Sequence, residues 1–176
     1  MKTTILLILL TLSTTVYSQK EKLNLTNALV IGMLDKQDER FSLEVSITEF
    51  LAERGINAVP SINVLKQGSD LEELASDSLQ QIVSKKGIDT YMLISVRGYD
   101  KRFKPSQQND SLKMALSYGS LFSLFRDEVV NVSFEIFIYR NDVLVKSQLV
   151  RCGNVNSREK VLIRFKKKLD RKMKKW

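Results

Sequence analysis

The stretch that most constrains the fold is the apolar run at 28–34, which is rich in valine, isoleucine and leucine and has polar residues on both sides. A run of this length and composition is typical of a strand that is covered on both faces. We therefore predict a central strand here, and we expect the rest of the sheet to be built around it.

The segment that follows, 41–55, allows two interpretations. Apolar and polar residues alternate over 41–47, which is the period of a strand. A stripe with helical spacing is also present and extends further along the chain, through Leu43, Ile47, Phe50 and Leu51. Gly55 suits the left-handed position that ends a helix. We favour the helix, which follows a charged turn at 35–40 and completes a βα unit.

The next elements continue the alternation of strands and helices. Apolar residues at 56–59 and 62–65 flank Pro60, which places this short strand at a sheet edge. A capping box at Ser69 and Glu72 predicts a helix that ends at Gly87 and could begin as late as Asp77, and the run at 88–96 predicts a third strand. Right-handed crossovers then give parallel strands in the spatial order 2-1-3.

The C-terminal half predicts a hairpin and a helix. Residues 130–139 alternate strongly, Asn141 and Asp142 suit a two-residue turn, and 143–151 returns. Residues 97–126 are interpreted as a loop and helical insertion, and 157–175 as a basic amphipathic helix capped near Asn156. The expected fold is a three-layer α/β sandwich with a mixed five-stranded sheet.

The first residues predict export. Lys2 precedes an apolar run at 5–12, and Ser18 is a residue that a signal peptidase accepts. A transmembrane anchor is the alternative, but the run falls short of the roughly 20 apolar residues that cross a bilayer. We expect a cleaved signal peptide at 1–18, a polar lead-in at 19–26 and one α/β domain at 27–176. No cysteine follows the apolar run, so a lipidation site is not expected, and the periplasm or cell envelope is the predicted location.

The net charge of +8 is concentrated at the C-terminus. Residues 158–176 hold ten lysines or arginines against two acidic residues, which gives +8, whereas 19–157 hold 17 basic and 18 acidic residues. The favoured interpretation is a helix that packs on the sheet and shows its lysines to water. A helix lying on an anionic membrane, with Trp176 at the interface, is the main alternative. A nucleic-acid partner is not expected for an exported protein.

Several chemistries lack their usual residues. The chain has no histidine, and the turn after the first strand has no glycine-rich phosphate loop, so zinc hydrolysis, Ser-His-Asp catalysis and nucleotide binding are not predicted. The single cysteine, Cys152, is interpreted as a half-buried strand residue. We predict no cofactor, no metal and no catalytic residue, although a hydrolase with a carboxylate pair stays open.

The predicted topology nevertheless favours one binding site. In a sheet ordered 2-1-3 a crevice lies beyond the carboxyl ends of the first and third strands. Asp35 and Arg40 would reach it from one loop, and Arg97, Tyr99 and Arg102 from the other. An anionic small ligand or an acidic peptide could bind there. The alternative is that these are solvated loop charges, with an Asp-Arg pair that holds the turn.

Four segments carry a resemblance to a known group of proteins. They are the strand NALVIGMLD, the helix end AERG, the helix end SKKG and the strand IDTYMLISVRG. Together with the hairpin and last helix, they resemble small secreted α/β domains of the bacterial envelope, such as the N-terminal domain of the Tol-system β-propeller protein and the curli-secretion lipoprotein superfamily. The resemblance implies a non-enzymatic binding or assembly role with an envelope protein partner. Peripheral attachment to an anionic membrane and hydrolysis of an unknown substrate are the alternatives.

Overall fold

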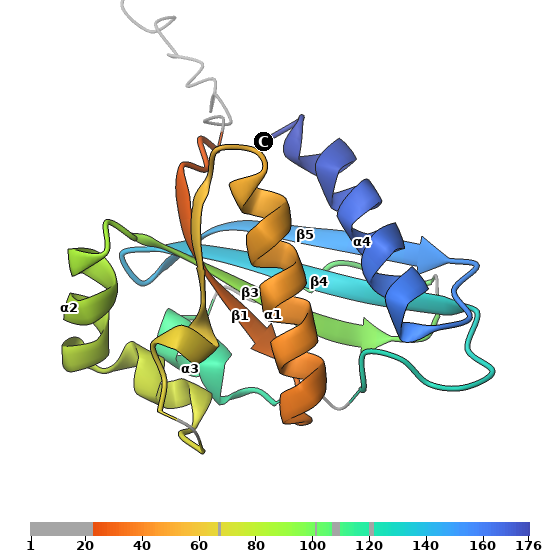
Figure 1. The fold of residues 1–176 in the computed structure, drawn as a ribbon, viewed down its shortest axis with the longest axis horizontal. Helices are drawn as coiled ribbons and strands as arrows, with labels where there is room; N and C mark the ends of the chain where they lie inside the picture. The colour runs from red at the N-terminus through yellow and green to blue at the C-terminus, as the bar shows by residue number, and fades with distance from the viewer. Residues whose placement is uncertain (1–22, 67, 101, 107–109, 120–121) are drawn as a thin grey trace, which may run out of the picture.

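The computed structural model describes residues 23–176 except 67, 101, 107–109 and 120–121. One five-stranded sheet runs through the domain in the order β2-β1-β3-β4-β5 (Figure 1). Its strands are β1 (Asn27–Met33), β2 (Asn57–Pro60), β3 (Thr90–Gly98), β4 (Asn131–Arg140) and β5 (Val143–Gly153). The pairs of β1 with β2 and β3 are parallel, and the pairs of β4 with β3 and β5 are antiparallel, so the sheet is mixed as predicted.

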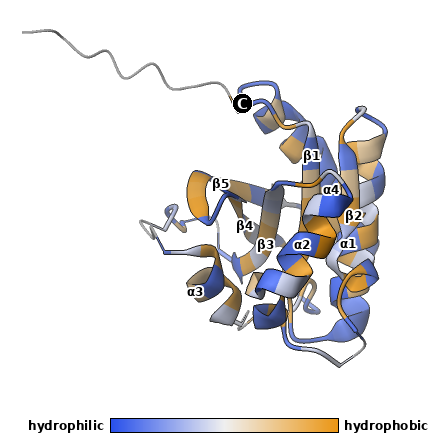
Figure 2. Ribbon diagram, turned by 90° about the vertical axis from the view of Figure 1, so that its left-hand side faces the viewer, coloured by the Kyte–Doolittle hydropathy of each residue, from blue (hydrophilic) through white to orange (hydrophobic). Residues whose placement is uncertain are grey.

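Helices cover both faces of the sheet. They are α1 (Gln37–Ala52), α2 (Asp77–Lys85), α3 (Leu112–Ser117) and α4 (Arg158–Met173), with two 3₁₀ turns, η1 (Ser61–Asn63) and η2 (Leu71–Ala75). Helices α1 and α4 lie side by side on one face, and α2, α3 and η2 pack on the other. Figure 2 shows α1 and α3 on opposite sides of the sheet, each with hydrophilic and hydrophobic residues. The predicted three-layer α/β fold is confirmed.

The first βα unit forms as the sequence predicts. Strand β1 is buried over nearly its whole length, and α1 ends before Gly55, whose φ of 73° is the left-handed conformation expected there. The alternation over 41–47 does not produce a strand, because the helical stripe buries Leu43, Ile47 and Leu51 against the sheet. The charged turn is shorter than expected, since α1 already begins at Gln37.

Three further boundaries differ from the sequence prediction. The strand at Pro60 does not resume, because 61–63 form η1. The helix expected from Ser69 splits into η2 and α2 at Ser76, whose extended backbone interrupts the helical path, and Ser69 caps neither of them. The later start at Asp77, which the sequence left open, is confirmed, because α2 begins at that residue. The predicted insertion at 97–126 begins later, because Arg97 and Gly98 extend β3, and it contains one described helix, α3.

The hairpin of β4 and β5 matches its sequence pattern. Asn141 and Asp142 both have positive φ, at 49° and 63°, as a tight two-residue turn requires. Residues Val132, Phe134 and Ile136 point to the face of α1 and α4, as the alternation predicts. The register places every second residue of β4 on the opposite face, where Glu135 is fully buried.

Helix α4 is an integral part of the core. Its Val161, Phe165 and Leu169 are fully buried, and the Phe165 ring lies 4.3 Å from that of Phe134 between ring centroids. Ser157, one residue after the expected cap, accepts a hydrogen bond from the Lys160 backbone N–H. Among the described residues, no helix is long and apolar enough to cross a membrane.

The burial of α4 makes a prediction about stability. Replacing Phe165 with alanine removes a buried ring, so the free energy of unfolding should fall by about 3 to 5 kcal/mol. Ile163→Ala is the matched control on the same helix, because Ile163 is 51% exposed and its loss should change stability by less than about 0.5 kcal/mol. Urea denaturation measures both, and equal effects would contradict the packing of α4.

Candidate functional site

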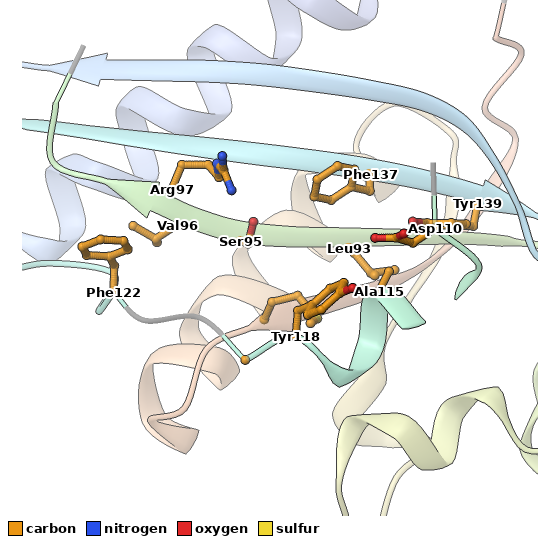
Figure 3. A pocket seen from close by; sticks show the side chains of 12 residues that line it. Leu93, Ser95, Val96, Arg97, Asp110, Ala115, Tyr118, Phe122, Phe137 and Tyr139 are labelled. Atoms are coloured by element: carbon orange, nitrogen blue, oxygen red, sulfur yellow. The ribbon is translucent and has the colours of Figure 1, made fainter. Parts of the chain in front are cut away.

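A pocket of about 250 Å³ opens on the face of α3, near the carboxyl ends of β1 and β3 (Figure 3). Its floor is the sheet, which contributes Leu93, Ser95, Phe137 and Tyr139. Ala115 and Tyr118 line it from α3 and the residue that follows the helix, and Phe122 lines another side. The lining is therefore largely aliphatic and aromatic, and the parallel strands position it at the switch point that the topology predicts.

Arg97 is the one cationic side chain among the described residues that line this pocket, and it is paired with a buried carboxylate. Its Nε lies 3.1 Å from Oε2 of Glu135, which is fully buried, although the two groups are not aligned as a hydrogen bond. The other carboxylate oxygen of Glu135 accepts hydrogen bonds from the Ser106 backbone N–H at 2.7 Å and the Ser147 hydroxyl at 3.2 Å. The charge of Arg97 is therefore largely balanced within the protein.

The tyrosine at the pocket floor is held in its neutral form. Burial, followed by the nearby carboxylates of Asp110 and Asp142, raises the pKa of Tyr139 from 10.0 to about 12. At neutral pH this phenol can donate a hydrogen bond but cannot act as a base. Asp110 is the one carboxylate among the described residues that line the pocket.

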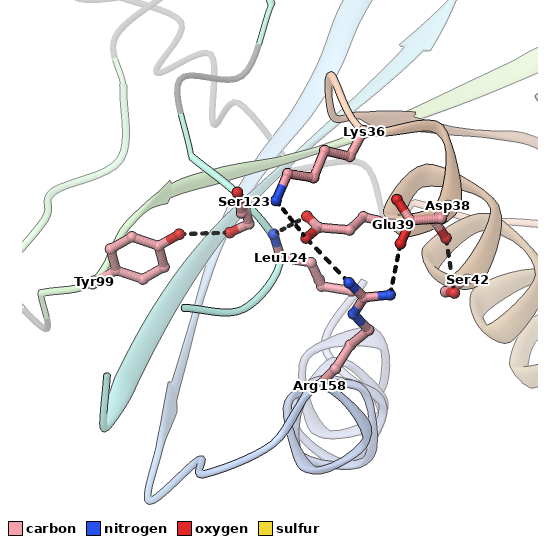
Figure 4. Close-up of polar contacts among 8 residues, drawn as sticks. All are labelled: Lys36, Asp38, Glu39, Ser42, Tyr99, Ser123, Leu124 and Arg158. Carbon is pink, nitrogen blue, oxygen red and sulfur yellow. Dashed lines mark hydrogen bonds and ion pairs between the residues drawn. The ribbon is translucent and has the colours of Figure 1, made fainter. Parts of the chain in front are cut away.

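The Phe122 side of the pocket is fixed by a polar network at the N-termini of α1 and α4 (Figure 4). Glu39, which is 2% exposed, accepts a hydrogen bond from the Leu124 backbone N–H and lies 3.4 Å from a guanidinium nitrogen of Arg158. The Tyr99 hydroxyl donates to the Ser123 carbonyl at 2.9 Å. These contacts hold the chain after Phe122 against both helices.

The structure separates the residues that the sequence groups into one site. Asp35 and Arg40 line a second hollow of about 270 Å³ beside η1, whereas Arg97 lines the first pocket. Arg40 is engaged there, because its Nε lies 3.0 Å from Oε1 of the buried Glu44 and its guanidinium also donates to the Ser61 hydroxyl.

The other two predicted residues have separate surroundings. Tyr99 contacts the core on the α1 side and the Phe122 ring, in an edge-to-face arrangement with centroids 5.6 Å apart. Arg102 is 90% exposed and pairs with Asp100 at 2.7 Å. Of the five predicted residues, only Arg97 lines the apolar pocket.

Sequence reasoning missed the aromatic and acidic residues that define this site. Phe137 and Tyr139 occupy the positions of β4 that the alternation assigns to the face opposite the main core. Glu135 lies two residues before Phe137 on the same face of β4, so the same alternation places its side chain on the face that carries α3. The alternation of β4 therefore indicates the position of Glu135, but its pairing with Arg97 follows only from the register of β3 and β4.

No cluster among the described residues is suited to hold a metal ion. Cys152 is fully buried, not half-buried as predicted, because it lies between the sheet and α4. Burial raises the pKa of its thiol from 9.0 to about 11, and the nearby Lys168 and Arg164 lower it only in part. The thiol is therefore neutral and shielded.

This state of Cys152 can be checked with a thiol reagent. Because the raised pKa keeps the thiolate scarce at pH 8, the folded protein should react with Ellman's reagent far more slowly than the unfolded chain. In guanidinium chloride the single cysteine should react fully and rapidly. Rapid reaction under native conditions would show that the α4 side of the core is open.

A second prediction concerns Arg97. Its replacement with alanine leaves the buried Glu135 without its cation, so the free energy of unfolding should fall by about 2 kcal/mol. Arg102→Ala removes the same charge from an exposed pair and should change stability by less than about 0.5 kcal/mol. Denaturant titrations of both variants measure the difference. An unchanged unfolding midpoint for Arg97→Ala would show that the pair of Arg97 and Glu135 does not stabilise the fold.

Comparisons with known proteins give similarities of fold at low identity. No family model and no curated protein matches the chain. Among solved structures, the dodecamer of a PelC variant from Paraburkholderia phytofirmans is 12% identical with a TM-score of 0.45, and the match covers 82% of this chain and 85% of that one. Lipoprotein GNA1162 from Neisseria meningitidis is 13% identical with a TM-score of 0.43, covering 75% and 82%. The resemblance to the Tol-system and curli-secretion domains stays a prediction.

Proposed function

We propose that the protein is an exported, non-enzymatic binding or assembly module of the cell envelope, and that the pocket beside α3 receives an apolar or aromatic side chain of a protein partner. The observation that carries the proposal is the size and lining of this pocket. Its volume of about 250 Å³ is below the roughly 300 to 1,000 Å³ of typical small-molecule sites. Such a volume suits one anchoring side chain of a partner.

The chemistry of the pocket supports binding over catalysis. Arg97 is balanced by Glu135, and Tyr139 is held protonated by its surroundings. Ser95 makes no hydrogen bond to Asp110, although both line the described part of the pocket. A hydroxyl nucleophile needs a base within hydrogen-bond reach, and this arrangement does not supply one. The polar groups can instead orient a bound side chain at the edge of an apolar hollow.

The proposal is tested by filling the pocket. Ala115→Phe, on α3, places a ring in the hollow, whereas Met114→Phe adds an aromatic ring at a 53% exposed position of the same helix. Each tagged protein is crosslinked in intact cells of its own source, and the co-purified proteins are identified by mass spectrometry. We expect one envelope protein to be recovered with the wild type and with Met114→Phe, and to be lost with Ala115→Phe.

Two results would count against the proposal. Recovery of the protein alone, with no co-purified partner, would argue against a binding module. Equal recovery of a partner with Ala115→Phe would show that the partner binds outside the pocket. A thermal melt of each variant must show a folded protein, because a loss of partner is informative only when the domain is intact.

A further inference from the structure

The outward side of α4 carries a row of cations. Lys160, Arg164, Lys167 and Arg171 follow one another at steps of four, three and four residues, which places them on one side of a helix with 3.6 residues per turn. All four side chains are exposed. At 1.5 Å per residue the row is about 16 Å long. We refer to these four residues as the α4 cationic row.

Asp170 and Asp38, two of the acidic residues near this row, are paired with other cations, whereas the exposed Glu159 beside Lys160 makes no ion pair among the described residues. Asp170 lies 2.8 Å from Arg54 of α1 and 3.5 Å from Lys174, and the resulting interactions lower the pKa of its carboxyl group. Asp38 is paired with Arg158 at 2.9 Å. The four cations of the row make no ion pair with any residue that the structure describes. Their charge is therefore available to a partner.

The opposite side of the helix is not available. Val161, Phe165 and Leu169 are fully buried on the sheet, and Trp176 is 5% exposed beneath the ammonium group of Lys146. The sequence alternative that placed Trp176 at a membrane interface is therefore wrong. A packed α4 has no apolar face to insert into a bilayer, and Ile163 alone gives the row an exposed aliphatic neighbour. Any binding by this surface is electrostatic.

The composition of the row favours a lipid surface over a protein partner. Specific protein interfaces are depleted in lysine and depend on buried aromatic or arginine anchors, whereas this row is half lysine and contains no aromatic residue. The hollow that Lys167 and Arg171 border is shared with the charged groups of Glu53, Arg54 and Asp170, so it is not an apolar anchoring pocket. A fluid array of anionic headgroups requires no shape complementarity and attracts each nearby basic residue. We propose that the α4 cationic row binds anionic phospholipid membranes electrostatically while α4 stays packed on the sheet. This inference does not depend on the pocket.

Vesicle sedimentation tests the inference. The chain from Gln19 onward is used, because it contains every described element and omits the predicted signal peptide, whose apolar run could itself bind lipid. We expect it to sediment with phosphatidylcholine vesicles that contain phosphatidylglycerol and not with phosphatidylcholine alone. Raising the salt from low to physiological ionic strength should weaken this binding, because exposed charges are screened.

A matched pair of variants locates the surface. The first replaces the α4 cationic row with glutamine (Lys160→Gln, Arg164→Gln, Lys167→Gln, Arg171→Gln). The second makes the same charge change at exposed lysines outside α1 and α4 (Lys66→Gln, Lys85→Gln, Lys86→Gln, Lys113→Gln). Because each basic residue near an anionic surface strengthens binding about fivefold, loss of all four should weaken the affinity of the row variant by roughly several hundredfold, and that of the control much less. Both should keep the wild-type melting temperature.

The single tryptophan reports whether α4 stays packed. Trp176 lies against the core at the end of α4, so electrostatic docking should leave the wavelength of its emission unchanged when vesicles bind. A blue shift with loss of quenching by iodide would show that the helix leaves the sheet and inserts, which would overturn docking of the packed helix.

Three other results would overturn the inference. The wild type could fail to sediment with phosphatidylglycerol vesicles at low salt. The control variant could lose as much binding as the row variant, which would show a response to net charge alone. Polyglutamate or duplex DNA could bind through the row while vesicles do not, which would assign the surface to a different polyanion.

Discussion

Three buried glutamates hold the strand ends and loops of this domain in place. Glu44 accepts hydrogen bonds from the backbone N–H groups of Gly32 and Ile62, Glu39 from that of Leu124, and Glu135 from that of Ser106. Each also lies beside an arginine: Arg40, Arg158 and Arg97, respectively. A buried carboxylate is costly unless it is paired and hydrogen-bonded, and each of these has an arginine beside it and at least one oxygen that accepts a backbone hydrogen bond, although Oε2 of Glu135 has only the ion pair with Arg97. The loops around the sheet therefore depend on contacts that a small change of strand register would break.

This arrangement determines what the two hollows at the sheet can do. Arg40 and Arg97, the two arginines that line these hollows, each already compensate a buried carboxylate, and the exposed Lys66 is a further cation at the edge of the second hollow. An anionic ligand would have to compete with Glu44 for Arg40 or with Glu135 for Arg97, whereas an apolar group would not displace either ion pair. The site that remains is the aromatic pocket between the sheet and α3, whose Phe122 side is in turn held by Glu39.

Local patterns in the sequence are sufficient for most of the strands and helices but not for these contacts. The apolar run of β1, the turn at Asn141 and Asp142, and the stripe of α4 each lie within one segment, so each could be predicted before any partner was known. The burial of Glu39 depends on Leu124, far along the chain, and a charged residue in the first turn of a helix is ordinarily exposed. The predicted site at Asp35, Arg40, Arg97, Tyr99 and Arg102 assumed that neighbouring loops share one crevice. In the structure Asp35 and Arg40 line one hollow and Arg97 lines another, while Tyr99 packs against the core and Arg102 is exposed.

The basic helix α4 and the pocket beside α3 lie on opposite faces of the sheet. Residues 19–157 are close to neutral, with 17 basic and 18 acidic residues, so the net charge comes almost entirely from the segment that contains α4. Helix α4 lies on the face of α1, and the pocket lies on the face of α3. An anionic surface would therefore orient the domain through α4 and leave the pocket on the far side of the sheet. Because the sheet separates the two sides, occupancy of one need not obstruct the other, and a membrane-docked domain could still present its pocket to a partner.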